Sequence, residues 1–118
     1  MTRRTERIAE QLRGEIARIL SEEATDPRLR LVTLTRVDVA PDLSNALVFW
    51  SSLGAGDEDS VKRTERGLES AAPFLRRQLS RVLPLRRIPA LRFRYDPSLA
   101  LGTETLSLLR SIADDEKT

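Results

Sequence analysis

The sequence predicts an α+β domain in which helices cover one face of a three-stranded mixed sheet. Two long segments, residues 5–21 and 59–82, carry apolar residues at the spacing of amphipathic helices. Three short segments, 31–39, 46–52 and 91–95, are rich in Val, Thr, Leu and aromatic residues and predict strands. A chain of 118 residues with 40% hydrophobic content is the size of one domain with one core.

The first helix is predicted over residues 5–21, with Thr5 as its N-cap. Ile8, Leu12 and Ile16 recur at three- and four-residue spacing and form its apolar stripe. The helix should end before Pro27, because the residue before a proline is pushed out of the helical region.

The strands at 31–39 and 46–52 are separated only by the turn Ala40–Leu43, which predicts an antiparallel hairpin. The second of these strands is apolar at both parities, which is typical of a strand in the middle of its sheet. We therefore expect Trp50 to be buried beside a helix.

The second helix is predicted from Asp59 or Ser60 to Val82. Pro73 conflicts with it, because an interior proline removes a hydrogen bond and clashes with the preceding turn. The segment is therefore either one helix kinked near Ala72 or two helices. The strand–helix–strand connection to residues 91–95 should be right-handed, which makes those strands parallel and leaves 46–52 central.

A last amphipathic helix is predicted to begin at Thr103, with Leu106, Leu109 and Ile112 on its apolar face. The acidic residues 114–118 are predicted to be a disordered tail. The expected organisation is a single domain over residues 1–113 followed by this tail.

Composition excludes several classes of site. The chain has no Cys and no His, so it has no disulfide framework and lacks the commonest zinc ligands. No apolar run approaches the roughly 20 residues of a membrane span, and the N-terminus lacks the apolar core of a signal peptide. We expect a cytoplasmic monomer with no cofactor, no small-molecule substrate and no membrane contact.

Residues 70–95 form a basic segment without any Asp or Glu. A basic helix face followed by a basic strand predicts a surface for an RNA backbone. The predicted phosphate contacts in this segment are Arg76, Arg77, Arg81, Arg86, Arg87, Arg92 and Arg94. Arg3, Arg4 and Arg7 are a predicted flexible supplement, and Arg28 and Arg30 are secondary candidates.

Two other classes of function compete with RNA binding. An enzyme without His or Cys would depend on Asp26, Asp38, Asp42 or Tyr95, and Asp26 and Asp42 are better explained as turn formers. A protein–protein adaptor without RNA contact would use the exposed apolar side of residues 46–52, at Leu47 and Phe49, and the acidic start of the second helix. An adaptor remains the alternative, and salt dependence separates it from an RNA binder.

The element order is that of a type II KH domain, an RNA-binding fold. The chain also contains a series of short motifs in a fixed order: Asp26-Pro27-Arg28-Leu29, Val37-Asp38-Val39, Asp42-Leu43-Ser44-Asn45-Ala46, Phe74-Leu75-Arg76, Leu85-Arg86-Arg87-Ile88-Pro89-Ala90-Leu91-Arg92-Phe93 and Tyr95-Asp96. By these motifs, from about Arg7 to Leu109, the chain resembles the bacterial ribosome-binding factor A family.

The resemblance implies a factor that binds the immature 30S ribosomal subunit, with its 16S rRNA and neighbouring ribosomal proteins as partners. It further implies help with late maturation and rRNA processing, growth in the cold, no enzymatic activity and no cofactor. The family lacks the GxxG loop of other KH domains and has an Ala-x-Gly kink. The corresponding residues here are Ala71, Ala72 and Pro73, with proline in the place of the typical glycine.

Overall fold

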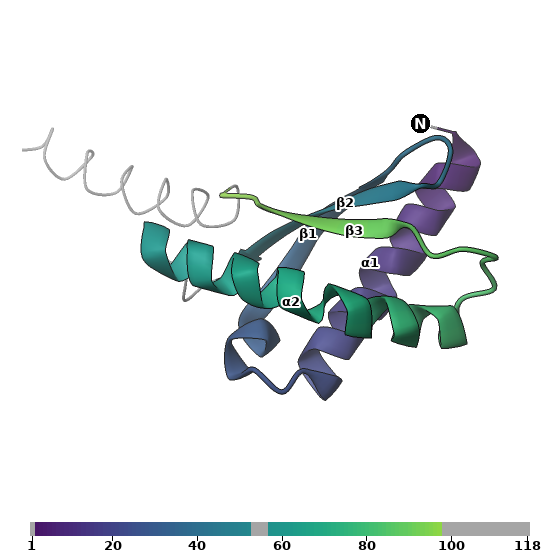
Figure 1. Cartoon of the computed structure of the whole chain (residues 1–118). Coiled ribbons are helices and arrows are strands. Elements are labelled where there is room, and N and C mark those ends of the chain that lie inside the picture. The colour runs from purple at the N-terminus through teal and green to yellow at the C-terminus, as the bar shows by residue number, and fades with distance from the viewer. Residues whose placement is uncertain (1, 53–56, 98–118) are drawn as a thin grey trace, which may run out of the picture.

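The computed structural model describes residues 2–52 and 57–97 (Figure 1). The elements are α1 (Arg3–Glu23), the 3-10 helix η1 (Pro27–Leu31), β1 (Val32–Val39), β2 (Asn45–Ser52), α2 (Glu58–Val82) and β3 (Ala90–Tyr95). The predicted helix from Thr103 and the predicted tail 114–118 lie outside the described residues.

Helix α1 begins two residues earlier than predicted, and its N-cap is Thr2 rather than Thr5. Thr5 N–H donates to the Thr2 hydroxyl (3.2 Å), while Thr2 N–H donates to the Thr5 hydroxyl (3.0 Å). This reciprocal capping box satisfies backbone donors at both positions. The prediction was wrong because either threonine has the chemistry of a cap, and only the pair of bonds selects Thr2.

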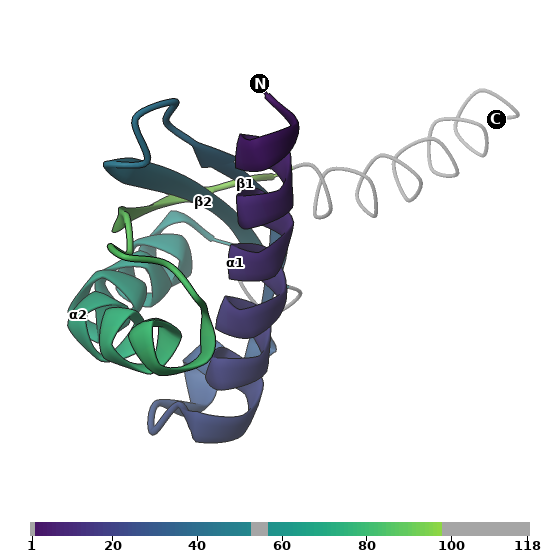
Figure 2. The ribbon, with the colours of Figure 1, turned by 90° about the vertical axis from the view of Figure 1, so that its right-hand side faces the viewer.

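The sheet has the order β1-β2-β3, with β1 and β2 antiparallel and β2 and β3 parallel, as predicted. Ala46, Val48 and Trp50 of β2 point into the core, and Trp50 is 0% exposed. Both helices pack on this side of the sheet: α1 lies against β1, and α2 lies beneath β3 (Figures 1 and 2). Leu47 and Phe49 point to the opposite, helix-free side and are half-buried.

Strand β1 contains a β-bulge that the prediction did not include. The pairing with β2 shifts between Leu34 and Arg36, so Leu34 and Val37 are both buried although they are three residues apart. The Thr35 hydroxyl donates to the Asp96 carboxylate (2.6 Å). The Asp96 N–H donates to the Trp50 carbonyl (2.6 Å), so the bulge is tied to the far end of β3.

The turn between β1 and β2 contains Leu43 at φ 63, in the left-handed region. This conformation costs a residue with a Cβ roughly 1–2 kcal/mol. The Leu43 side chain packs against the core, and its N–H donates to the Ala40 carbonyl (2.8 Å). These contacts hold the turn in place despite the strain.

Helix α2 is one continuous helix through Pro73, so the two-helix alternative is wrong. It begins at Glu58, one residue before the predicted start, because the Asp57 carboxylate caps it through Ser60 N–H (2.6 Å). Val82, the last residue of the helix as predicted, is 48% exposed, and Leu83 after it enters the core.

The 3-10 helix takes Leu31 out of the predicted first strand, and Leu31 is 62% exposed. Across residues 2–52 and 57–97, no helix is long and apolar enough to cross a membrane.

Candidate RNA-binding surface

The second half of α2 carries Arg76, Arg77 and Arg81, all exposed. Arg77 and Arg81 are four residues apart and share one side of the helix, while Leu75 and Leu79 are buried on the other side. Neither guanidinium has a hydrogen bond or ion pair with the described residues. Arg81 lies in the last turn, where a positive charge also favours the helix dipole.

Arg76 has a structural contact of its own. Its Nη2 donates to the Ile88 carbonyl (2.9 Å), which ties α2 to the loop that follows it. Arg76 therefore positions this loop, and the exposed remainder of its side chain stays available to a ligand.

The loop of residues 83–89 places two further arginines between α2 and β3. Leu83, Ile88 and Pro89 are buried and hold the loop on the core, while Arg86 and Arg87 are exposed. The loop ends beside the β1–β2 turn, because Ala90 N–H donates to the Ser44 carbonyl (3.0 Å).

Arg87 acts on that turn electrostatically. The pKa of Asp42 is below its usual value, mainly because the Ser44 hydroxyl and N–H donate to its carboxylate. The positive charge of Arg87 adds a smaller contribution in the same direction. Asp42 thus offsets part of the charge of Arg87, whereas Arg86 has no such partner among the described residues.

The first turns of α1 carry Arg3, Arg4 and Arg7, all exposed. Arg7 follows Arg3 by four residues and Arg4 by three, so it lies on the same side of the helix as both. Positive charge at a helix N-terminus opposes the helix dipole, so these arginines do not favour the helix that carries them. Glu6 is the acidic residue of this turn. They were predicted to be a flexible supplement, but the structure places them in regular helix.

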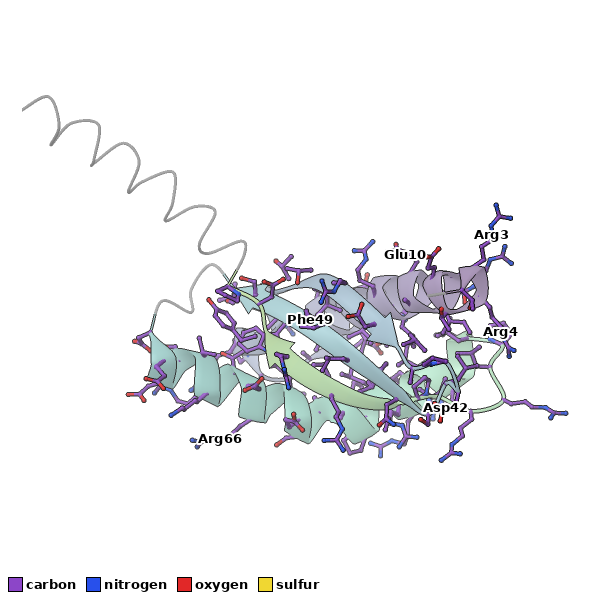
Figure 3. All side chains as sticks on the ribbon, turned by 90° about the horizontal axis from the view of Figure 1, so that it is seen from above. Arg3, Arg4, Glu10, Asp42, Phe49 and Arg66 are labelled. Atoms are coloured by element: carbon purple, nitrogen blue, oxygen red, sulfur yellow. The ribbon has the colours of Figure 1, made fainter. Side chains whose placement is uncertain are left out.

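The structure gathers these three segments at one end of the molecule. Figure 1 shows the start of α1, the β1–β2 turn, the end of α2 and the 83–89 loop at the same end, and Figure 2 looks onto it. Arg3, Arg4 and Asp42 are labelled at this end in Figure 3. We call it the basic end. Its arginines are Arg3, Arg4, Arg7, Arg76, Arg77, Arg81, Arg86 and Arg87.

Arg92 and Arg94 lie elsewhere. Because Leu91 and Phe93 point into the core, the alternation of β3 turns both arginines to the helix-free side of the sheet. Helix α2 packs on the other side. The basic residues of α2 and of β3, predicted to be within reach of one ligand, are therefore on different surfaces joined by the 83–89 loop.

Arg36 is a basic residue that the prediction missed. It lies on the helix-free side of the sheet, opposite Phe49 in the register, and its guanidinium carbon is 4.2 Å from the Phe49 ring centroid. The signal was present in β1, where apolar residues change parity from Leu34 to Val37. That change indicates a bulge, and the bulge places Arg36 beside Phe49.

Arg28 and Arg30 lie in η1, after the C-terminal end of α1. The 21 residues of α1 span about 31 Å, which separates them from the basic end. Arg30 Nε also donates to the Ala24 carbonyl (3.2 Å), where α1 ends. The structure does not bring these two arginines together with the others.

One of the three predicted kink residues borders an apolar groove. Ala71 borders an apolar groove of about 530 Å³ between the end of α1, η1 and the middle of α2, with Leu29 and Phe74 among its other walls. Ala72 is half-buried, and Pro73 is exposed. None of the three presents a charged group to a ligand.

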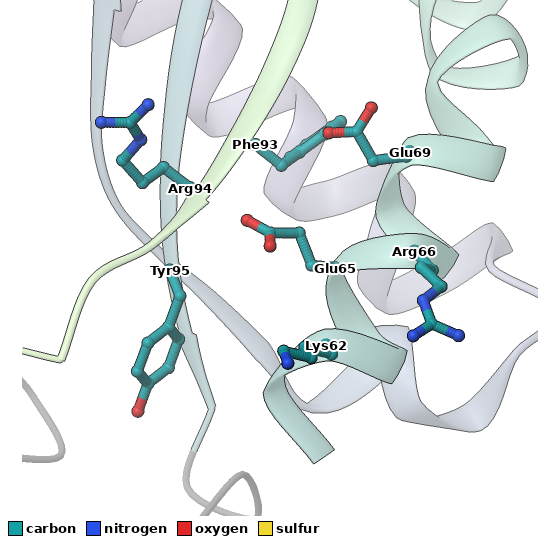
Figure 4. Close-up of a pocket in the computed structure, with 7 residues that line it drawn as sticks. All are labelled: Lys62, Glu65, Arg66, Glu69, Phe93, Arg94 and Tyr95. Atoms are coloured by element: carbon teal, nitrogen blue, oxygen red, sulfur yellow. The ribbon is translucent and has the colours of Figure 1, made fainter. Parts of the chain in front are cut away.

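A groove of about 600 Å³ runs between the first half of α2 and β3 (Figure 4). Lys62, Arg66 and Arg94 line it together with Glu65 and Glu69. Two carboxylates in this groove repel phosphate, so this half of α2 is a poorer surface for RNA than the basic end. In the part of the chain that the structure describes, no acidic cluster could hold a metal ion.

Comparison with known proteins identifies the family. The family model of ribosome-binding factor A matches residues 4–109. This chain belongs to the ribosome-binding factor A family. Ribosome-binding factor A of Pelobacter propionicus is 45% identical over 115 residues, covering 98% of this chain and 93% of that protein. The factor of Stutzerimonas stutzeri is 44% identical over 116 residues, covering 97% and 90%.

Solved structures of ribosome-binding factor A share the fold. The crystal structure of the Thermus thermophilus protein matches with a TM-score of 0.67 at 27% identity, covering 77% of this chain and 93% of that one. A homology model of the Thermus thermophilus ribosome-binding factor A, fitted into a cryo-EM map of a 30S–RbfA complex, also matches, with a TM-score of 0.62 at 28% identity, covering 75% of this chain and 91% of that one. The predicted KH-like α+β fold is confirmed.

Proposed function

We propose that this chain binds the immature 30S ribosomal subunit, contacts its 16S rRNA, and assists late subunit maturation and rRNA processing, including in the cold. The observation that carries this proposal is the basic end, where the start of α1 and residues 76–87, distant in sequence, bring exposed arginines together. The fitting of a relative into a 30S complex supports the choice of partner.

Arg77, Arg81, Arg86 and Arg87 are the proposed principal phosphate contacts, with Arg3, Arg4 and Arg7 as the part supplied by α1. Phosphate contacts dominate affinity for nucleic acid and position the protein without reading bases. Phe93 and Trp50 are buried and take no part in base stacking at this end. We therefore propose recognition of RNA shape and backbone there.

We propose a binding role without catalysis, because the acids that an enzyme would need already have structural contacts. Asp26 caps η1 by accepting from Arg28 N–H (3.0 Å), and Asp42 accepts from Ser44. Asp38 pairs with Arg36 (3.2 Å), and the Tyr95 ring packs edge-on against Trp50.

Sedimentation of the purified chain with immature small subunits tests the proposal. At low salt we expect it in the small-subunit fractions of a sucrose gradient. Its affinity should then fall steeply as salt rises, because phosphate contacts release counterions. Recovery only at the top of the gradient at low salt would contradict the proposal. Binding that resists salt would favour the protein–protein adaptor instead.

A further inference from the structure

The helix-free side of the sheet is a second surface with its own chemistry. The register places Leu47 between Asp38 and Arg92, and Phe49 between Arg36 and Arg94. Figure 3 looks onto this side and labels Phe49 on it. We call it the open face, formed by Arg36, Asp38, Leu47, Phe49, Arg92 and Arg94.

The centre of the open face is a stack of two planar groups. The Arg36 guanidinium lies over the Phe49 ring at 4.2 Å, and Asp38 holds it there through a 3.2 Å ion pair with Arg36 Nε. The Arg36 side chain is still 62% exposed. Its outer surface is therefore a fixed planar cation on which another flat group can stack.

The edge of the open face is positively charged and has no partner of its own. Arg92 and Arg94 are exposed, and neither has a hydrogen bond or ion pair with the described residues. Asp38 is neutralised by its ion pair with Arg36. Asp96, two residues after Arg94, accepts a hydrogen bond from the Thr35 hydroxyl of β1. Two residues along a strand separate Arg92 and Arg94 by about 6.6 Å, so each can meet a different phosphate.

We propose that the open face binds a single-stranded segment of RNA. Arg92 and Arg94 contact successive phosphates, and one base stacks on the Arg36–Phe49 pair. A paired helix hides its base faces, so only an unpaired strand can use both parts of this surface. An acidic peptide would match the arginines but would leave the planar stack unused.

The open face is distinct from the basic end, since β3 turns Arg92 and Arg94 to the helix-free side of the sheet. Arg94, on this edge strand, also borders the groove between β3 and the first half of α2, where Glu65 and Glu69 lie. The inference rests on the proposed function in one respect: ribosomal RNA is the expected source of the strand. Two surfaces on different sides of the fold would let the chain hold a structured part of the subunit and an unpaired strand at once.

Fluorescence polarisation of the full chain with a labelled 12-nucleotide oligouridine strand tests the inference. We expect Arg36→Gln to weaken binding about tenfold, the scale of losing one stacked base. Arg36→Lys should weaken it nearly as much, because lysine keeps the charge but not the plane. The double variant Arg92→Lys with Arg94→Lys should bind nearly as the parent chain does, since phosphate contact needs charge alone.

The double variant Arg92→Gln with Arg94→Gln should lower the salt slope for oligouridine by about 1.4, the value for two lost single-strand contacts. Arg63→Gln with Arg66→Gln is the matched control, because it removes two exposed arginines from the acid-lined half of α2. An RNA duplex of the same length should be insensitive to Arg36→Gln.

Unchanged oligouridine binding by the open-face variants would overturn the inference. If the parent chain still sediments with small subunits, the proposed function survives that result. If sedimentation fails, the oligouridine measurement still decides the open face separately. A photo-crosslinker at position 49 that captures ribosomal protein rather than rRNA would overturn the inference. So would NMR contacts between the Phe49 ring and residues 98–118 in the free chain.

Discussion

Trp50 and Asp42 show how a fully buried side chain and an exposed one each stabilise the fold. Trp50 is 0% exposed at the centre of β2, and its ring meets Tyr95 edge to face with centroids 5.0 Å apart. Its indole N–H has no hydrogen-bond partner among the described residues. Asp42 is exposed in the β1–β2 turn and acts through hydrogen bonds from Ser44.

Two substitutions of Trp50 distinguish the contribution of its buried ring to stability from that of its indole N–H. Trp50→Ala should lower the free energy of unfolding by about 3–5 kcal/mol, because a large buried ring leaves a cavity. Trp50→Phe should cost clearly less, since it keeps most of the ring and removes a donor without a partner. Urea denaturation measures both. Red-shifted, easily quenched Trp emission in the native protein would contradict the buried placement.

The charge state of Asp42 should affect stability at acid pH. Its pKa is lowered in the folded state, so its contribution is fully present above the ordinary Asp pKa of about 3.9. That contribution is lost as pH falls through the lower folded value. In an NMR titration, Ser44→Ala should return the pKa toward normal more than Arg87→Gln does, because Ser44 is the larger cause. The reverse order would refute this assignment.

At the scale of the element, helix interiors contain three residues that disfavour helix: Gly14 in α1, and Gly67 and Pro73 in α2. Each has a different environment. A Cβ at Gly14 would meet nothing within 4 Å, whereas a Cβ at Gly67 would lie 3.3 Å from Leu29 Cδ2. Pro73 is exposed within a helix that continues past it.

The two glycines form a matched pair for substitution. Gly14→Ala should raise the free energy of unfolding by about 1 kcal/mol, because alanine favours helix and meets open space. Gly67→Ala should gain less, since its methyl group must displace Leu29 of η1. Thermal melts of both variants compare them directly. Equal gains would show that η1 moves aside freely.

Pro73 tests whether the shape of α2 matters for binding. Pro73→Ala restores a backbone donor and should stabilise the helix, by up to about 3 kcal/mol. Pro73→Gly should remain about 1 kcal/mol below the alanine variant. If Pro73→Ala straightens α2, sedimentation with small subunits should weaken because the basic second half is re-aimed. An alanine variant with unchanged affinity would show that the shape of α2 at Pro73 has no role in binding.

The whole molecule separates positive charge into distinct surfaces. The basic end collects arginines from α1, α2 and the 83–89 loop, while the open face carries Arg92 and Arg94. The first half of α2 instead mixes Arg66 with Glu65 and Glu69 beside the groove. Figure 3 shows Arg66 pointing away from the sheet, far from Arg3 and Arg4.

The effect of charge reversal on small-subunit binding should therefore depend on where the reversed arginines lie rather than on how many are reversed. Arg77→Glu with Arg81→Glu should abolish small-subunit binding and leave the melting temperature nearly unchanged, because exposed charges contribute little to stability. Arg86→Glu with Arg87→Glu should act similarly but less strongly, since Asp42 already offsets Arg87. Arg63→Glu with Arg66→Glu is the control of equal charge. If all three double variants weaken binding equally, the effect is one of net charge.

Local patterns in the sequence were enough to predict α1, α2, the three strands, the strand order and the burial of Trp50, although they did not predict η1. Periodicity reports which side of an element is apolar, and the crossover rule then restricts the topology. The continuity of α2 through Pro73 and the choice of Thr2 as the cap were decided by contacts. Whether a threonine caps a helix, or a helix continues through a proline, depends on the hydrogen bonds and contacts around that residue. Those contacts involve neighbours that a periodic pattern of apolar residues does not encode.

The arrangement of the arginines was decided only by the tertiary structure. The sequence shows that residues 70–95 are basic. It does not show on which side of the sheet each of these arginines lies. Burial of Leu91 and Phe93 turns Arg92 and Arg94 to the open face, and the β1 bulge brings Arg36 over Phe49. Packing of the core thus sorts one basic segment into two surfaces, because each buried apolar residue determines where its charged neighbour must point.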